Sequence, residues 1–88
     1  MVCLDGELAF STWNSFKQSS VAPGTFELRE GAQLAASGAF RFEAHWRPTI
    51  VRSAVNLTKA TAEVELVVRN NRGRAVRHTM RCVESEIG

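Results

Sequence analysis

The chain has 88 residues, of which 44% are hydrophobic, enough for a folded core and too many for a disordered segment. This length makes a single domain over residues 1–88 and excludes two independent cores. The formal net charge is +2, and no apolar run approaches the roughly 18–20 residues that cross a membrane, so we expect no membrane span.

The first segment, from Leu4 to Ser20, predicts a helix. Asp5 can cap its N-terminus, and three apolar residues follow at helical spacing, namely Ala9, Trp13 and Phe16. The same segment also fits an alternating strand with the apolar residues Leu8, Phe10 and Phe16. We favour the helix and keep the strand as the alternative.

The next part of the chain predicts a turn, a short strand and a connection. Pro23 and Gly24 predict the turn, which ends the first segment. Thr25–Arg29 then alternates between polar and apolar residues, which is typical of a short strand. The stretch from Gly31 to Gly38 is rich in small residues, and we expect connecting chain there with at most one helical turn.

The middle of the chain predicts two further strands. In the first, the residues that alternate onto the core face are Phe40, Phe42, Ala44 and Trp46. His45 falls on its solvent face, and Pro48 ends the run because proline lacks an N–H group. The second strand runs from Ile50 to Leu57, with an apolar face that holds Val51, Val55 and Leu57.

The last hairpin allows its register to be predicted. A three-residue loop from Asn71 to Gly73 puts Gly73 in the left-handed region, which glycine adopts without steric strain. The core face then has Val68 opposite Val76, Leu66 opposite His78 and Val64 opposite Met80, and it continues to Cys82. A four-residue loop would mix the two faces. Since a slip of one residue inverts a strand, we predict the three-residue loop.

Arginines gather on this hairpin. Residues 41–81 hold nine basic and three acidic residues, a net charge of +6, and nine of the eleven basic residues in the chain are arginines. The candidate binding residues are Arg69, Arg77 and Arg81 on one face and Arg72 and Arg74 at the tip. Guanidinium groups bind phosphate and carboxylate groups, so these residues form either an anion-binding face or a solvated surface.

Two features of the hairpin argue against the binding of nucleic acid by these arginines. Glu63 and Glu65 lie on the same face, where they can pair with Arg81 and Arg77 across the strands. No Phe or Trp is interleaved there to stack on bases. We therefore expect a solvated, ion-paired face, and a protein rather than a nucleic acid as the partner.

The two cysteines, Cys3 and Cys82, lie almost at the two ends of the chain. They are either two unrelated buried thiols, which is typical of a cytosolic protein, or a disulfide that ties the first segment to the last strand. In the loop-entropy model such a cross-link is worth roughly 4–5 kcal/mol. That is a large contribution for so small a domain.

The hairpin also carries a family resemblance. Its pattern Asn70-x-x-Gly73-x-x-Val76-Arg77-x-x-Met80-x-Cys82 is similar to the closing hairpin of a group of small bacterial exported or lipoprotein-attached domains with no assigned activity. Other residues also lie at positions comparable to those of the group: Cys3, Trp13, Phe16 and the segment from Lys17 to Ser20, which leads to Phe26. The chain departs from the group at Arg72, where an aromatic residue is usual. The resemblance implies an extracytoplasmic α+β domain with a Cys3–Cys82 disulfide, and it implies no known activity.

Few side chains suit catalysis or metal binding. The only aspartate is Asp5, and no nucleophile motif accompanies the histidines. His45 lies on a solvent face, while His78 lies on a core face, where we expect an ordinary hydrogen-bonded side chain. Neither the cysteines nor the histidines have the paired spacing of a zinc site, and no glycine-rich phosphate loop exists. We expect no enzymatic activity, no metal and no cofactor.

These observations predict an α+β domain in which an N-terminal helix packs on an antiparallel sheet of three to five strands; an all-β, sandwich-like domain is the alternative. The expected function is a non-enzymatic binding or accessory domain, bacterial and extracytoplasmic. The alternative is a small cytoplasmic protein of a phage or mobile element that binds nucleic acid or an acidic protein through the arginine-rich hairpin. The first residues have no signal-peptide pattern, so an exported form would be a mature fragment with an added Met.

Overall fold

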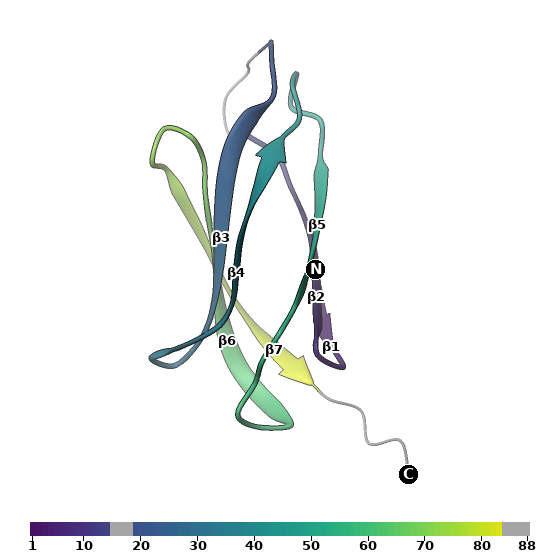
Figure 1. Ribbon diagram of the computed structural model, residues 1–88, viewed down its shortest axis with the longest axis vertical. Coiled ribbons are helices and arrows are strands. Elements are labelled where there is room, and N and C mark those ends of the chain that lie inside the picture. Colours follow the sequence, from purple (N-terminus) through teal and green to yellow (C-terminus); the bar gives the residue numbers. More distant parts are fainter. Residues whose placement is uncertain (15–18, 84–88) are drawn as a thin grey trace.

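The computed structural model describes residues 1–14 and 19–83, and these form seven β-strands without a helix (Figure 1). In chain order the strands are β1 (Val2–Leu4), β2 (Glu7–Thr12), β3 (Ala22–Glu30), β4 (Gln33–Phe42), β5 (Thr49–Ala54), β6 (Thr61–Arg69) and β7 (Ala75–Val83). In this described part of the chain, no helix is long and apolar enough to cross a membrane.

The strands form one sheet in the order β4-β3-β6-β7-β1-β2-β5. The sheet curls until its end strands, β4 and β5, lie beside each other, so that it is a nearly closed barrel around a core to which every strand contributes (Figure 1). Hydrogen bonds at and just beyond the ends of these strands connect them. Thr49 Oγ1 accepts from the N–H of Glu43 and donates to the carbonyl of Arg41, both at 3.2 Å. The N–H of Asn56 donates to the carbonyl of Ala35 at 2.9 Å.

The expected α+β class is wrong, because the first segment is a hairpin and not a helix. Asp5 and Gly6 have φ angles of +53° and +76°, which together make the two-residue turn that β-hairpins favour. The turn joins β1 to β2 and sets Leu4 opposite Glu7. Asp5 is therefore a turn residue rather than a helix cap.

The burial of β2 follows the period of a strand. Leu8 and Phe10 are buried, as the strand alternative predicts, whereas Trp13 is 60% exposed. Phe16, which both interpretations used, lies outside the described residues. The domain is thus all-β, with one barrel-like sheet.

The predictions for residues 23–24 and for Gly31 to Gly38 are also wrong. Pro23 and Gly24 lie inside β3, and Gly31 to Gly38 forms the turn into β4 and most of that strand. Proline is tolerated in β3 because β6 joins this strand only from Thr25 onward, so Pro23 has a neighbouring strand on one side only.

The glycines of β3 and β4 make room for aromatic rings of the opposite strand. Gly24 lies opposite Phe40, and Gly38 lies opposite Phe26. A Cβ atom would lie 2.9 Å from the Phe40 ring at Gly24 and 2.8 Å from the Phe26 ring at Gly38. Glycine is therefore required there by close packing across the strands, and not by a turn.

The strand expected from Phe40 to Trp46 ends at Phe42. His45 and Trp46 have φ angles of +58° and +60° in the connection that follows, and Trp46 is 53% exposed rather than part of the core. The next strand is confirmed in part. It begins at Thr49 and ends at Ala54, before Leu57, with Val51 buried at its centre.

The register of the last hairpin is confirmed. Val68 lies opposite Val76, Leu66 opposite His78 and Val64 opposite Met80. Gly73 has a φ of +78°, its N–H donates to the carbonyl of Asn70 at 3.1 Å, and the N–H of Asn70 donates to the carbonyl of Arg74 at 2.9 Å. These are the features of the predicted three-residue loop.

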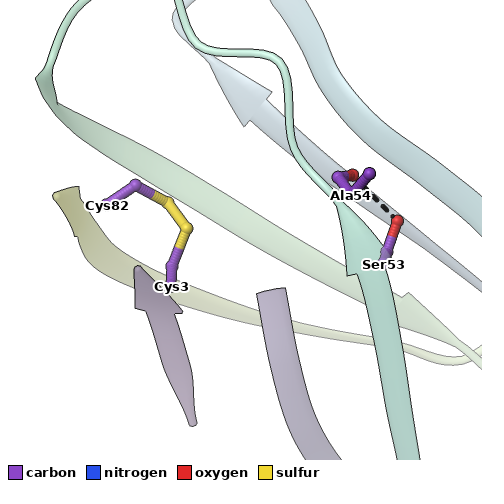
Figure 2. The surroundings of a disulfide bond; sticks show 4 residues. All are labelled: Cys3, Ser53, Ala54 and Cys82. Atoms are coloured by element: carbon purple, nitrogen blue, oxygen red, sulfur yellow. Dashed lines mark hydrogen bonds between the residues drawn. A yellow bond between two sulfur atoms is a disulfide. The ribbon is translucent and has the colours of Figure 1, made fainter. Parts of the chain in front are cut away.

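Cys3 and Cys82 form a disulfide, as predicted (Figure 2). It links β1 to β7 with a Cα–Cα distance of 4.7 Å. The two strands are parallel and pair only where Leu4 lies opposite Val83, beside which the N–H of Asp5 donates to the Val83 carbonyl at 2.9 Å. The connection between β1 and β7 is thus confined to one end of β7.

Candidate binding site at an open seam

The five arginines proposed from the sequence lie where the register puts them. Arg69, Arg77 and Arg81 share the outer face of β6 and β7, and Arg72 and Arg74 lie at the hairpin tip. The expected ion pairs are present: Arg77 Nη1 lies 3.0 Å from Glu65 Oε1, and Arg81 Nη2 lies 3.7 Å from Glu63 Oε1. Binding of any ligand by these arginines remains a prediction.

One buried side chain gives this outer face a structural role. Val67 points to the outer face and is absent from the core cluster, yet it is only 2% exposed. Its cross-strand neighbours are Glu27 and Arg77. Long charged side chains can cover apolar surface with their carbon stems while the charged ends stay in water. We infer that the side chains of this face shield Val67.

A gap in strand pairing lies between β2 and β7. β1 continues along β2 only as far as Val2, opposite Ala9, and it pairs with β7 only at Leu4. Beyond β1, no strand of the described chain lies between β2 and β7. We call the space between residues 10–12 of β2 and residues 75–81 of β7 the open seam.

The hydrogen-bond pattern shows which backbone groups of β7 face the open seam. Bonded and non-bonded pairs alternate along an antiparallel ladder. Because Asn70 bonds to Arg74, the pairs that bond toward β6 involve every second residue of β7, namely Val76, His78, Met80 and Cys82. The N–H and C=O groups of Arg77, Thr79 and Arg81 therefore point into the seam.

The same argument applies to β2. The N–H of Val55 donates to the carbonyl of Gly6 at 2.9 Å, so Leu8, Phe10 and Thr12 bond toward β5. The backbone of Ser11 therefore points the other way, into the seam. Both edges of the open seam thus carry backbone groups without a strand partner in the described residues.

A cavity of about 340 Å³ lies along the open seam. Its lining includes Phe10 of β2 and Leu66 and Val68 of β6, all of which are buried. Three exposed apolar side chains also line it, namely Trp13 (60% exposed), Met1 (55%) and Val76 (48%). The site is therefore an apolar cavity with an exposed apolar rim between two unpaired strand edges.

Comparison with protein-family models, curated proteins and solved structures finds no match.

Both ends of the open seam are fixed. At one end the disulfide joins β1 to β7. At the other end Asn14, which is fully buried, donates to Asn71 Oδ1 and accepts from Asn70 Nδ2, each at 3.5 Å. A seam held at both ends can keep its shape while its middle stays open.

The histidines are not placed as expected. His78 faces inward but is exposed, because no strand covers that side of β7, and it lines the cavity rather than the core. His45 is exposed in a connection and not on a strand. Within residues 1–14 and 19–83, no group of three or more His, Cys, Asp or Glu side chains could hold a metal ion.

The open seam and the residues that line it were not predicted from the sequence. Met1, Phe10, Trp13 and Val76 were not considered as site residues. The available signal was the Asp5-Gly6 pair, since Asp-Gly between alternating apolar residues predicts a tight hairpin.

The carboxylate of Glu30, at the end of β3, provides a test of local electrostatics. Glu30 Oε1 accepts from the N–H of Thr58 at 2.9 Å and from its Oγ1 at 2.8 Å. These bonds favour the ionised form and, with the charge of Lys59, lower the pKa of Glu30 below its usual 4.5, against a smaller effect of burial.

The depressed pKa of Glu30 predicts an acid-dependent loss of stability. In the folded state Glu30 stays ionised to lower pH than in the unfolded chain, so its contribution is complete above about pH 4.5 and disappears as the pH falls through the folded pKa. We expect the free energies of unfolding of wild type and Glu30→Gln, measured in urea, to differ by a constant amount near neutral pH. In acid, the two values should become equal. Thr58→Val keeps the N–H donor, so it should lose only part of the stabilisation that ionised Glu30 provides. A difference that persists unchanged to about pH 2 would contradict the assignment.

Proposed function

We propose that this domain is a non-enzymatic binding module that binds a protein partner at the open seam. The observation that carries the proposal is the apolar cavity with Met1, Trp13 and Val76 exposed at its rim. Exposed apolar side chains that gather around a cavity mark interaction sites more often than scattered ones do. A Trp at such a rim can supply much of the binding energy.

We place the domain in an oxidising, extracytoplasmic compartment. The Cys3–Cys82 disulfide supports this, because disulfides persist in exported proteins and are rare in the cytosol. A bacterial source rests on the family resemblance alone. Two of the five candidate arginines, Arg77 and Arg81, form ion pairs with Glu65 and Glu63, which makes the arginine face the less favoured main site.

Site-specific photocrosslinking tests the proposal. A photoreactive phenylalanine analogue replaces Trp13 in one variant and Leu34, an equally apolar residue of β4 that is 50% exposed, in the control. Both are irradiated with the exported proteins of the producing organism. We expect a discrete protein adduct from position 13 and none from position 34. Equal labelling from both positions, or none from either, would contradict a partner at the seam.

A binding titration tests the alternative that the arginine-rich hairpin binds nucleic acid. A labelled oligonucleotide is titrated with the domain across about 50–200 mM salt, where a genuine phosphate interface loses affinity steeply. We expect no saturable binding at the upper value. Submicromolar binding there, lost when Arg69, Arg77 and Arg81 are changed to Ser, would favour the arginine face instead.

A further inference from the structure

We propose that the open seam accepts one extended peptide strand of the partner, aligned with β1, with alternating apolar and acidic side chains. This inference rests on the proposed function and names the chemistry of its partner. The strand would run antiparallel to β2 and parallel to β7, as β1 does. Its C-terminal end would lie toward Met1.

The backbone supports strand addition. Arg77, Thr79 and Arg81 on one edge, and Ser11 on the other, direct N–H and C=O groups into the seam. An unpaired strand edge is a template for another extended chain, and an added strand gains affinity from main-chain hydrogen bonds. Continuing the register of β1 places Val2 and Met1 alongside Arg81 and Met80, so residues 75–79 remain for the peptide. With a rise of about 3.3 Å per residue, they offer an edge about 15 Å long.

The register of β1 fixes which side chains of the peptide point inward. Cys3 of β1 is buried in the core cluster, and Met1, two residues earlier, lines the cavity. In this register Met1 itself lies opposite Phe10, so the first peptide residue lies opposite Ser11 and faces solvent, and the next, opposite Thr12, faces the cavity. Apolar side chains at the inward positions would contact Leu66 and Val68.

The positive charge on β7 favours acidic side chains at the outward positions of the peptide. An outward residue of the peptide lies beside Arg77 or Thr79, because β1 and β7 are parallel and equivalent residues of parallel neighbours share a face. The side chain of Arg77 remains 59% exposed despite its ion pair with Glu65. It can therefore contact a further carboxylate on the peptide.

The same charges disfavour a second copy of this chain as the occupant. If two copies paired antiparallel through their β7 edges with Thr79 opposite Thr79, Arg77 of one copy would lie opposite Arg81 of the other. Like charges opposite each other across strands are destabilising. An acidic, alternating peptide has neither this repulsion nor the bulk of a folded domain.

Peptide binding tests the proposal directly. The probe is fluorescein-labelled Val-Glu-Val-Glu-Val-Glu-amide, titrated with the oxidised full chain and followed by fluorescence anisotropy. The controls are the same six residues in block order, the lysine counterpart, and the alternating peptide with N-methyl groups on alternate amides. We expect saturable binding of the alternating acidic peptide only, with each control weaker by about tenfold or more, since one lost hydrogen bond is worth about that factor.

Variants of the domain separate backbone pairing from charge. Thr79→Pro removes an N–H that points into the seam without removing a bond to β6, and Thr79→Val is its matched control. Arg77→Glu reverses a charge at the seam, and Arg41→Glu reverses one on β4, away from it. We expect Thr79→Pro and Arg77→Glu to weaken binding about tenfold, and their controls to leave it unchanged. Should Thr79→Pro fail to fold, the N-methylated peptide tests the same bonds on the wild-type domain.

The outcomes distinguish the two proposals. Equal binding of the alternating, block-order and N-methylated peptides, or no binding of any, would overturn strand addition. A crosslinked partner at position 13 without peptide binding would leave the proposed function standing. No crosslink and no peptide binding would overturn both.

Discussion

Reduction of the Cys3–Cys82 disulfide is expected to lower the free energy of unfolding by about 4–5 kcal/mol, the largest effect we predict. The bond closes a loop with a sequence separation of 79 residues, and the cross-link removes much of the conformational freedom of the unfolded chain. A domain of this size is stabilised by only about 5–15 kcal/mol in total. Urea unfolding of the oxidised and reduced forms, followed by Trp fluorescence, measures the difference.

The double variant Cys3→Ala, Cys82→Ala separates the cross-link from the reductant. Both sulfur atoms are buried, so this variant also loses a little packing and should be at least as unstable as the reduced wild type. The reductant should have no effect on it. The same unfolding midpoint for oxidised and reduced wild type would contradict the expectation.

The last hairpin was predictable because its information is local. Gly73 and the alternation of the two flanking strands fix the loop length, and the loop length fixes every cross-strand pair down to Cys82. The ion pairs of Arg77 and Arg81 then follow from the register.

The errors arose where non-local contacts decide the structure. The small residues of β4 resemble connecting chain, but Gly38 is small because the Phe26 ring of the neighbouring strand occupies the space of its side chain. In the first segment, the helical spacing from Ala9 to Trp13 favoured a helix with Asp5 as its cap, and a turn at Asp5-Gly6 was not considered. The segment forms a strand instead, because this conformation buries Leu8 and Phe10 together on one face of β2.

The open seam could not be predicted from any one segment. It exists because β1 is short and pairs with β7 at a single position, so that residues 10–12 and 75–81 lack a strand between them. The disulfide that resemblance and size suggested is also what fixes one end of this seam. Resemblance and domain size predict the cross-link, but they do not predict the opening beside it.

Substitution of Gly24 by Ala is expected to destabilise the domain by about 1–3 kcal/mol through overpacking. Gly24 lies on the inner face of β3, where a Cβ atom would lie 2.5 Å from the Phe42 ring and 2.9 Å from the Phe40 ring. These rings pack against each other with centroids 4.8 Å apart, and Phe42 is only 2% exposed, so neither can move aside freely. Urea unfolding of Gly24→Ala measures the effect, and Pro23→Ala, at the exposed neighbouring position, should change stability much less.

A double-mutant cycle identifies the cause of the Gly24→Ala effect. Phe42→Leu alone removes part of a buried ring and lowers stability, but it also frees the space that the new Cβ needs. Combined with Gly24→Ala, it should therefore destabilise the domain less than the sum of the two single changes, with a coupling of about 0.5–3 kcal/mol. Strictly additive effects would mean that Gly24→Ala acts through the backbone and not through contact with the aromatic rings.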